Sequence, residues 1–253
     1  METKVIVCDL DNTLLNGDKN ITGYTLETLK LCRERGMKVV INTARPPRAV
    51  TMYTDKFPFD GVVTYNGGHA TDGVHTEIRD IRRETGEELI TRLFGRYVHR
   101  PRVSVEVDDM GYANYELPGA VYQAEHWEDF PRLPEGRVMK IHVAIESPAM
   151  VEQVKGLMTD EIYMTVAAHR SIQIMTREAT KWKGLCRLLE HWNAQPEQVI
   201  YFGDDNDDVE PIRLAGTGVA MKNAIPAAME EADYITGTNN EEGVAHYLRR
   251  FVL

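Results

Sequence analysis

The segment VIVCDLDNTLL, which begins at Val5, constrains the fold of this chain more than any other. Its first four residues form an uninterrupted apolar run, which is typical of a strand buried on both faces in a parallel sheet. Asp9 and Asp11 follow at once. Two carboxylates this close repel each other unless a cation neutralises them, and α/β proteins bind ligands at the carboxyl edge of the sheet. The segment therefore predicts a buried strand whose end carries a site for a divalent cation.

The same pattern returns along the chain, in MKVVINTAR, GVVTYNGG and EQVIYFGDDNDD, where an apolar run again ends in polar residues. Helical patterns lie between these runs. In ITGYTLETLKLCRERG, for example, Leu26, Leu29 and Cys32 fall on one helical face, and Gly36 is a good stop. Alternation of strands and helices implies right-handed parallel crossovers. We therefore expect an α/β fold, a Rossmann-like doubly wound parallel sheet, with the strand ends converging on one edge.

The middle of the chain has a different periodicity. VSVEVDDMGYANYE and RVMKIHVAIE alternate apolar and polar residues, and YMTVAAHRSIQIMT predicts two strands joined tightly at His169 and Arg170. Alternation of this kind indicates a sheet with one open face. We expect residues 82–178 to form an inserted α+β cap domain, and residues 1–81 and 179–253 to form the core.

Composition narrows the class of protein further. A chain of 253 residues can bury a full core, and its formal net charge of −10 disfavours a nucleic-acid partner. No apolar run approaches the roughly 18 residues of a membrane span, and METKVIV leaves no room for a signal peptide. The three cysteines lie in apolar segments and predict buried thiols in a reducing compartment. We expect a cytoplasmic protein without a membrane partner.

Four polar clusters fall at the predicted strand ends or beside them: Asp9 with Asp11, Thr43 with Arg45, Lys181, and Asp204 with Asp208. Acids from two distant strands suit Mg²⁺, which prefers oxygen ligands and keeps several waters. A lysine and a hydroxyl between them suit a phosphoryl group, whose negative charge needs donors. One carboxylate can then attack phosphorus, and a second can act as acid and base.

The motifs DLDNTLL, INTAR, TKWKGL and GDDNDD, in this order, resemble the four signature motifs of the haloacid dehalogenase superfamily. The place of the inserted domain, between the third strand and the lysine, is similar to that in the C2-capped branch, the Cof-type (IIB) phosphatases. The C-terminal stretch GVAMKNAIPAAMEEADYITGTNNEEGVAHYL also resembles that subfamily. The resemblance covers the whole core, whereas the cap matches only in position and element order.

The resemblance implies a role for each matching catalytic residue. Asp9 is expected to be the nucleophile, and Asp11 the acid that protonates the leaving oxygen and then activates water. Thr43 and Lys181 are expected to hold the phosphoryl oxygens. Lys183 precedes Gly184 and mimics the common Lys-Gly pair, but alignment of the helix that follows places Lys181 in the catalytic position.

The same resemblance implies the metal and substrate contacts. Mg²⁺ is expected to bind Asp9, the main-chain carbonyl of Asp11, and Asp204, with Asp208 supporting the metal or its waters. The predicted substrate-binding residues are Arg45, Asn66, Gly67 and Asp207. The sequence departs from the family at two of its motifs: Ala44 stands where Gly is frequent, and Asp207 where Asn is common.

These expectations define a Mg²⁺-dependent phosphatase that hydrolyses a small phosphorylated metabolite, such as a sugar phosphate, through an aspartyl phosphate. No obligate protein partner is implied. A phosphomutase is the alternative, because it uses the same aspartyl phosphate but returns the phosphoryl group to substrate. A signalling receiver also phosphorylates an aspartate near a Thr and a Lys, but the inserted domain and Asp11 argue against it.

Overall fold

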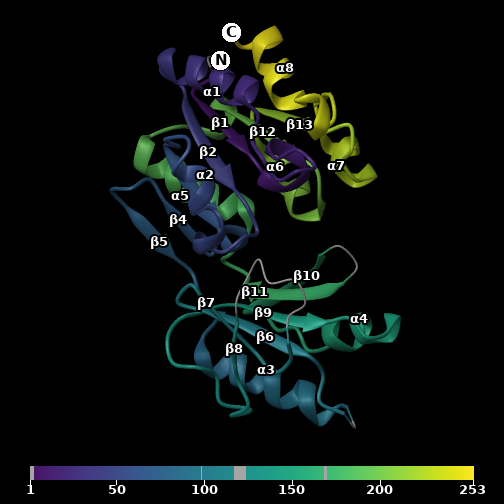
Figure 1. Cartoon of the computed structure of the whole chain (residues 1–253). Coiled ribbons are helices and arrows are strands. Elements are labelled where there is room, and N and C mark those ends of the chain that lie inside the picture. The colour runs from purple at the N-terminus through teal and green to yellow at the C-terminus, as the bar shows by residue number, and fades with distance from the viewer. Residues whose placement is uncertain (1–2, 98, 117–123, 168–169) are drawn as a thin grey trace. The chain divides into compact units, whose positions relative to one another are not determined.

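The computed structural model describes residues 3–97, 99–116, 124–167 and 170–253. The chain forms two compact units (Figure 1). The first, here called the core unit, comprises the chain up to Arg45 together with Val50–Ile78 and Thr180–Leu253. The second, the inserted unit, comprises Pro46–Ala49 and Arg79–Ala179. The tight connection predicted at His169 lies outside the described residues.

The core unit is built on one eight-stranded sheet. Neighbouring strands follow the order β14 (Tyr234–Ile235), β13 (Thr217–Ala220), β12 (Val199–Gly203), β1 (Val5–Cys8), β2 (Lys38–Asn42), β3 (Gly61–Thr64), β4 (His69–Thr71) and β5 (Thr76–Ile78). From β14 to β3 all pairs are parallel, whereas β4 and β5 pair antiparallel at one edge. The predicted parallel sheet is confirmed, and the edge hairpin adds to it.

Strand β1 lies at the centre of this sheet, between β12 and β2. Its four apolar side chains are almost completely buried, as expected for a strand covered on both faces. Because the three strands run parallel, their carboxyl ends lie at one edge, and the residues that follow them are Asp9, Thr43 and Asp204. The central strands thus deliver polar side chains to a single edge of the sheet.

Helices pack on this sheet through apolar side chains. Helix α1 begins after Thr22, whose hydroxyl accepts a hydrogen bond from the Thr25 N–H at 3.2 Å, and it buries Leu29 and Cys32. Helix α1 contacts α8, and α5 contacts α6. The core-unit helices are α1 (Gly23–Glu34), α2 (Thr51–Thr54), α5 (Lys181–Trp192), α6 (Val209–Leu214), α7 (Pro226–Glu231) and α8 (Gly243–Phe251).

The described residues of the inserted unit contain a second sheet, of six strands, and two α-helices. The strand order is β10 (Ile162–Ala167), β11 (Ser171–Thr176), β9 (Val138–Ala144), β6 (Val103–Val107), β7 (Met110–Ala113) and β8 (Ala124–His126). Helices α3 (Arg83–Gly95) and α4 (Pro148–Lys155) share one apolar core with this sheet. The side chains that the sheet contributes to it alternate along the strands, so one face of the sheet is apolar.

The cysteine prediction differs from the structure at one position. Cys8 and Cys32 are buried free thiols, but Cys186 is only half-buried, so the prediction of three buried thiols is wrong at this position. Cys186 lies on α5 away from the residues of that helix that are buried, which include Leu185 and Leu189.

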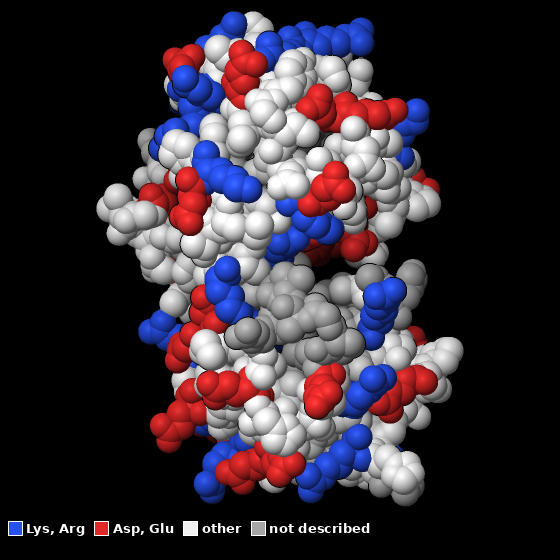
Figure 2. All heavy atoms as spheres, in the orientation of Figure 1, with Lys and Arg blue, Asp and Glu red and all other residues white. Residues whose placement is uncertain are grey.

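Among the described residues, no helix has the length and apolar character needed to cross a membrane. Acidic and basic side chains are interspersed over the face shown in Figure 2.

Candidate active site

Asp9 directly follows β1 and has a side chain that is almost completely buried. Its backbone N–H donates to the Phe202 carbonyl at 3.0 Å, which extends the pairing of β1 with β12 by one residue. Its Oδ1 accepts a hydrogen bond from Lys181 Nζ at 2.8 Å. Within the described part of the chain, Oδ2 accepts no hydrogen bond. Asp9 is therefore held through one oxygen, and the other is available for chemistry or a cation.

Lys181 is the first residue of α5, and its side chain is only 2% exposed. The helix start is fixed because the Thr180 hydroxyl accepts the Lys183 N–H at 3.2 Å. Lys181 Nζ lies 2.7 Å from Asp208 Oδ1 and 3.1 Å from Asp207 Oδ1. Burial alone would lower the pKa of Lys181, but the surrounding carboxylates raise it well above its ordinary value. Lys181 is thus a buried cation at neutral pH.

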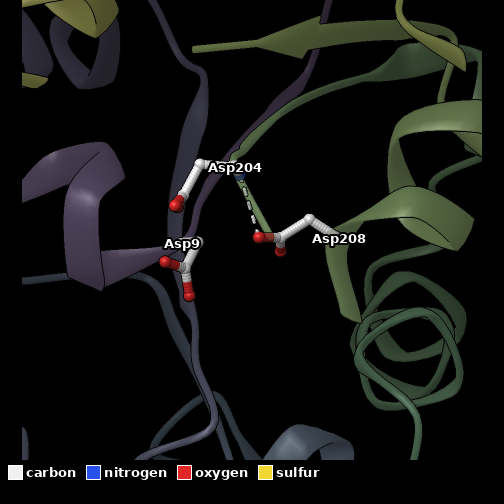
Figure 3. Close-up of side chains that lie close together, drawn as sticks. All are labelled: Asp9, Asp204 and Asp208. Carbon is white, nitrogen blue, oxygen red and sulfur yellow. Dashed lines mark hydrogen bonds between the residues drawn. The ribbon is translucent and has the colours of Figure 1, made fainter. Parts of the chain in front are cut away.

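Asp208 is fully buried and has both carboxylate oxygens occupied. Oδ1 accepts from Lys181 and from the Tyr201 hydroxyl, both at 2.7 Å, and Oδ2 accepts the backbone N–H of Asp204 at 3.0 Å (Figure 3). Gly203 leaves room for this side chain, because a Cβ there would lie 2.5 Å from Asp208 Cβ. Asp208 therefore positions Lys181 and the loop that carries Asp204, and it offers no unoccupied oxygen to a metal.

Asp9, Asp204 and Asp208 form the acidic cluster of the site, with one oxygen of each within 4.8 Å of the others. Asp204 Oδ1 accepts from the Thr13 hydroxyl at 2.7 Å. Burial, followed by the charge of Asp208, raises the pKa of Asp204 to about 7. Burial also raises the pKa of Asp9, against the effect of Lys181. Both acids are therefore costly to keep ionised here, and a bound divalent cation would remove that cost.

Asp11 lies two residues beyond Asp9 and points to a different set of partners. Arg45 clamps its carboxylate with two hydrogen bonds, from Nε at 2.6 Å and from Nη2 at 2.7 Å, and Lys19 Nζ donates at 2.7 Å. The guanidinium is itself fixed over the Tyr53 ring, at 5.4 Å from the ring centroid. Burial alone would raise the pKa of Asp11, but the Arg45 and Lys19 hydrogen bonds hold it below its ordinary value. Asp11 is therefore ionised in this arrangement.

The other predicted contact residues lie beside these two groups. Thr43 is buried after β2, and its hydroxyl accepts the Arg45 N–H at 3.3 Å. Asn66 donates from its side-chain amide to Asp207 Oδ2 at 2.6 Å. Gly67 has a φ of +96°, and a Cβ there would lie 1.9 Å from the Thr180 carbonyl oxygen. This position thus requires glycine, because the backbone packs too closely on the start of α5 to leave room for a Cβ.

Some residues with structural importance for the site were not identified from the sequence. The Asn42 side-chain amide donates to the Lys181 carbonyl at 2.9 Å, and Tyr201 and Lys19 supply the contacts described above. Only Tyr201 carried a usable signal, since it lies on the strand that precedes the acidic loop. The predicted catalytic and metal-binding roles remain predictions, although the structure brings Asp9, Lys181, Asp204 and Asp208 together.

Comparison with known proteins places this arrangement in a family. The model of the haloacid dehalogenase-like hydrolases matches residues 6–248, so the chain belongs to that family. The resemblance to the haloacid dehalogenase superfamily and its Cof-type phosphatases is confirmed with it, as is the predicted fold class, and the chain is a phosphatase.

Individual relatives match over nearly their full length. The 5-amino-6-(5-phospho-D-ribitylamino)uracil phosphatase YitU of Bacillus subtilis is 30% identical, with 99% of each chain covered. The HMP-PP phosphatase of Yersinia enterocolitica is 25% identical, with 96% of this chain and 93% of that protein covered. The solved structure of the HAD subclass IIB sugar phosphatase BT4131 has a TM-score of 0.84 at 20% identity, covering 98% of this chain and 99% of the other. The last likeness supports the fold alone.

Proposed function

We propose that this phosphatase hydrolyses a small phosphorylated metabolite, such as a sugar phosphate, in the presence of Mg²⁺ and through an aspartyl phosphate on Asp9. The proposal depends on how the two carboxylate oxygens of Asp9 are hydrogen-bonded. One of its oxygens is bound by Lys181, and the other accepts no hydrogen bond within the described residues. A carboxylate oriented in this way can present an oxygen to phosphorus while the adjacent ammonium balances charge.

In the first half of the reaction, Asp9 attacks phosphorus, and the bond from phosphorus to the leaving oxygen breaks. Asp11 supplies the proton to that oxygen. In the second half, Asp11 removes a proton from water, which attacks the aspartyl phosphate and releases inorganic phosphate and free Asp9. In both halves, the ammonium group of Lys181 stabilises the negative charge on the phosphoryl oxygens. Asp11 is ionised while it is bound to Arg45 and Lys19, so it must leave these partners and take up a proton from solvent before it can protonate the leaving oxygen. The proton that it later removes from water restores this protonated form.

The donor set of the acidic cluster fits Mg²⁺. Carboxylate oxygens are its preferred protein ligands, and Asp9 and Asp204 each have an oxygen without a hydrogen-bond partner among the described residues. We assign these two side chains to the metal, together with the main-chain carbonyl of Asp11. Asp208 acts behind them, because its oxygens are occupied. When bound, the cation neutralises the charge shared by the carboxylates and the phosphoryl group.

The substrates that are named for two relatives support the proposed substrate class. YitU and the HMP-PP phosphatase both act on small phosphorylated compounds, as their names state. We extend that class to this chain. We also propose that the enzyme acts in the cytoplasm, where such metabolites occur, without nucleic acid, membrane or an obligate protein partner.

Two variants test the proposal with an aryl phosphate whose phenol is a good leaving group. Asp9→Asn should abolish all turnover. Asp11→Asn should slow hydrolysis of an alkyl phosphate by about 10²- to 10⁴-fold, but it should still let an aryl phosphate phosphorylate Asp9. We expect a burst of phenol near one equivalent of enzyme in Asp11→Asn only. A similar burst in Asp9→Asn, with reversion to Asp excluded by mass spectrometry, would show that the nucleophile is another residue.

A further inference from the structure

Asp207 stands at a position where Asn is common in the family, and it adds a carboxylate beside Lys181. Its Oδ1 lies 3.1 Å from Lys181 Nζ, and its Oδ2 accepts a hydrogen bond from the Asn66 side-chain amide at 2.6 Å. All three residues belong to the core unit. The side chain of Asp207 is 21% exposed, whereas Lys181 and Asn66 are buried. Asp207 thus links two buried side chains and is the most exposed of the three.

The ammonium group of Lys181 has three N–H groups, and two of them already have acceptors. They donate to Asp9 Oδ1 at 2.8 Å and to Asp208 Oδ1 at 2.7 Å. Asp207 is the third carboxylate in contact with this nitrogen. In the proposed reaction, Lys181 also has to bind an oxygen of the phosphoryl group. The remaining N–H group can point to Asp207 or to a phosphoryl oxygen, but not well to both.

The three carboxylates that contact Lys181 are not held equally firmly. Asp208 is fully buried, its Oδ1 also accepts the Tyr201 hydroxyl at 2.7 Å, and its Oδ2 accepts a main-chain N–H at 3.0 Å (Figure 3). Asp9 directly follows β1 and is almost completely buried. Asp207 has the longest contact with Lys181 and the most exposed side chain. A phosphoryl oxygen that takes the third N–H group should therefore displace Asp207.

Asn66 keeps the carboxylate of Asp207 close to Lys181. Asn66 is fully buried and has a φ of +54°, a left-handed conformation that Asn adopts more readily than most residues. Its backbone N–H donates to the Thr43 carbonyl at 3.1 Å, which fixes it to the end of β2. Burial raises the pKa of Asp207, and Lys181 opposes that rise. Because both oxygens of Asp207 face N–H groups, this geometry holds its ionised form.

An ionised carboxylate at this position repels a phosphate that is bound to the same lysine. Acceptors that share one ammonium group lie about 5 Å apart. At this distance, two like charges near a protein surface repel each other strongly enough to change an affinity by at least about tenfold. Inorganic phosphate, the product of the proposed reaction, is mainly a dianion at mildly alkaline pH. Asp207 should therefore weaken the binding of product as well as of substrate.

We propose that Asp207 competes with the phosphoryl group for Lys181, and that it thereby weakens the binding of inorganic phosphate and limits product inhibition. This inference rests on the phosphatase function proposed above. Asp207 acts through Lys181, so it is a positioning residue and takes no part in the chemistry at phosphorus. Since it acts on bound substrate and bound product alike, Asp207 should raise KM and the inhibition constant of phosphate together.

Inhibition of p-nitrophenyl phosphate hydrolysis by inorganic phosphate, at mildly alkaline pH and with Mg²⁺ saturating for each variant, tests this inference. Asp207→Asn keeps the shape of the side chain and removes its charge, and Asp207→Ala removes both oxygens. Each should lower KM and the inhibition constant of phosphate by at least about tenfold, while kcat stays the same or falls. A merely structural role predicts weaker binding, so the direction of the change is decisive.

Asp205→Asn is the matched control, because it removes one charge from the same loop, where the Asp205 side chain accepts the Asn206 N–H at 2.8 Å. Both constants should change by less than about threefold. Urea unfolding measures phosphate affinity without turnover, since a ligand that binds only the folded state raises the urea midpoint. The midpoint shift caused by a fixed phosphate concentration should be larger for Asp207→Asn than for wild type. The same curves show that each variant is folded.

The possible outcomes separate this inference from the proposed function. Inhibition constants that are unchanged or raised in both Asp207 variants, or that fall equally in Asp205→Asn, would overturn the role of Asp207 and leave the phosphatase mechanism intact. A wild-type enzyme that hydrolyses no phosphate ester would instead overturn the proposed function. In that case the midpoint shifts alone decide whether Asp207 weakens phosphate binding, and equal shifts in wild type and Asp207→Asn would refute it.

Discussion

Replacing Lys181 by Met should destabilise the core unit more than any other single change at the site. The side chain is 2% exposed and lies 2.8 Å from Asp9, 2.7 Å from Asp208 and 3.1 Å from Asp207. Methionine has a similar shape but carries no charge, so the buried carboxylates of Asp9 and Asp208 and the half-buried carboxylate of Asp207 lose their cation. Removing one partner from a buried ion pair typically costs about 3–5 kcal/mol, and we expect a loss of free energy of unfolding in that range.

The size of this loss should depend on pH. Without Lys181, the buried acids have pKa values further above their ordinary value, so the folded state binds more protons than the unfolded state at intermediate pH. Stability of the variant therefore falls as the pH rises through the raised pKa values. The difference between wild type and Lys181→Met should be smaller near pH 5 than near pH 8. Added Mg²⁺ should recover part of it at the higher pH, because the cation replaces lost positive charge.

Tryptophan fluorescence can isolate the core unit in this measurement. Trp182 follows Lys181 at the start of α5, Trp192 is the last residue of that helix, and the third tryptophan, Trp127, lies in the inserted unit. In a Trp127→Phe background, urea unfolding followed by fluorescence reports α5 alone. Lys183→Met, in the same turn of the helix, is the matched control and should change stability by less than about 0.5 kcal/mol. A loss under about 1 kcal/mol for Lys181→Met, or an equal loss for Lys183→Met, would refute the argument.

Three further predictions concern other parts of the molecule. Asp204→Asn should raise the Mg²⁺ concentration for half-maximal activity by more than about tenfold, whereas Asp205→Asn on the same loop should not, and a metal titration of activity decides between them. Gly67→Ala should cost about 1–3 kcal/mol in urea unfolding, because its Cβ would meet the Thr180 carbonyl; no measurable cost would show that the α5 start can move. The pKa of His142 falls from 6.5 to about 3 on folding, so the unfolded state binds more protons between these values and wild type loses stability as the pH falls below 6.5. His142→Phe should reduce that loss by up to about 1.4 kcal/mol per pH unit in chemical denaturation, and identical pH profiles would contradict it.

The parallel sheet was predictable because its signal is local. In a strand, four successive apolar side chains, as at Val5–Cys8, are all buried only where both faces are covered, and the acids that follow them then lie at the sheet edge. The hairpin β4–β5 was not predicted, because three-residue strands such as His69–Thr71 are too short for a periodic pattern. Their pairing depends on β3, which supplies the neighbouring strand.

The expectation that Lys181 lies in the site, and not Lys183, came from aligning the helix that follows with that of the family, and helical geometry accounts for the burial of Lys181. Residues two apart on a helix point in different directions, so only one of the two can face the sheet edge. The buried positions of α5, including Leu185 and Leu188, share a face with Lys181. The burial of Lys140 in the inserted unit was not predictable, for the opposite reason. Alternation predicts which side chains share a face, but burial of Lys140 depends on contacts between strands far apart in sequence.

Arg45 lies in the candidate active site, and the sequence alone does not identify its partner. A positive side chain two residues after Thr43 can bind a phosphate or a carboxylate, and the spacing does not distinguish them. In the structure its guanidinium makes a two-point contact with Asp11, 34 positions earlier, and is braced by Tyr53. That pairing favours the ionised form of Asp11, which suits a base that activates water. In the proposed mechanism, proton donation to a leaving oxygen has the opposite requirement, so Asp11 and Arg45 would have to separate and meet again within each turnover.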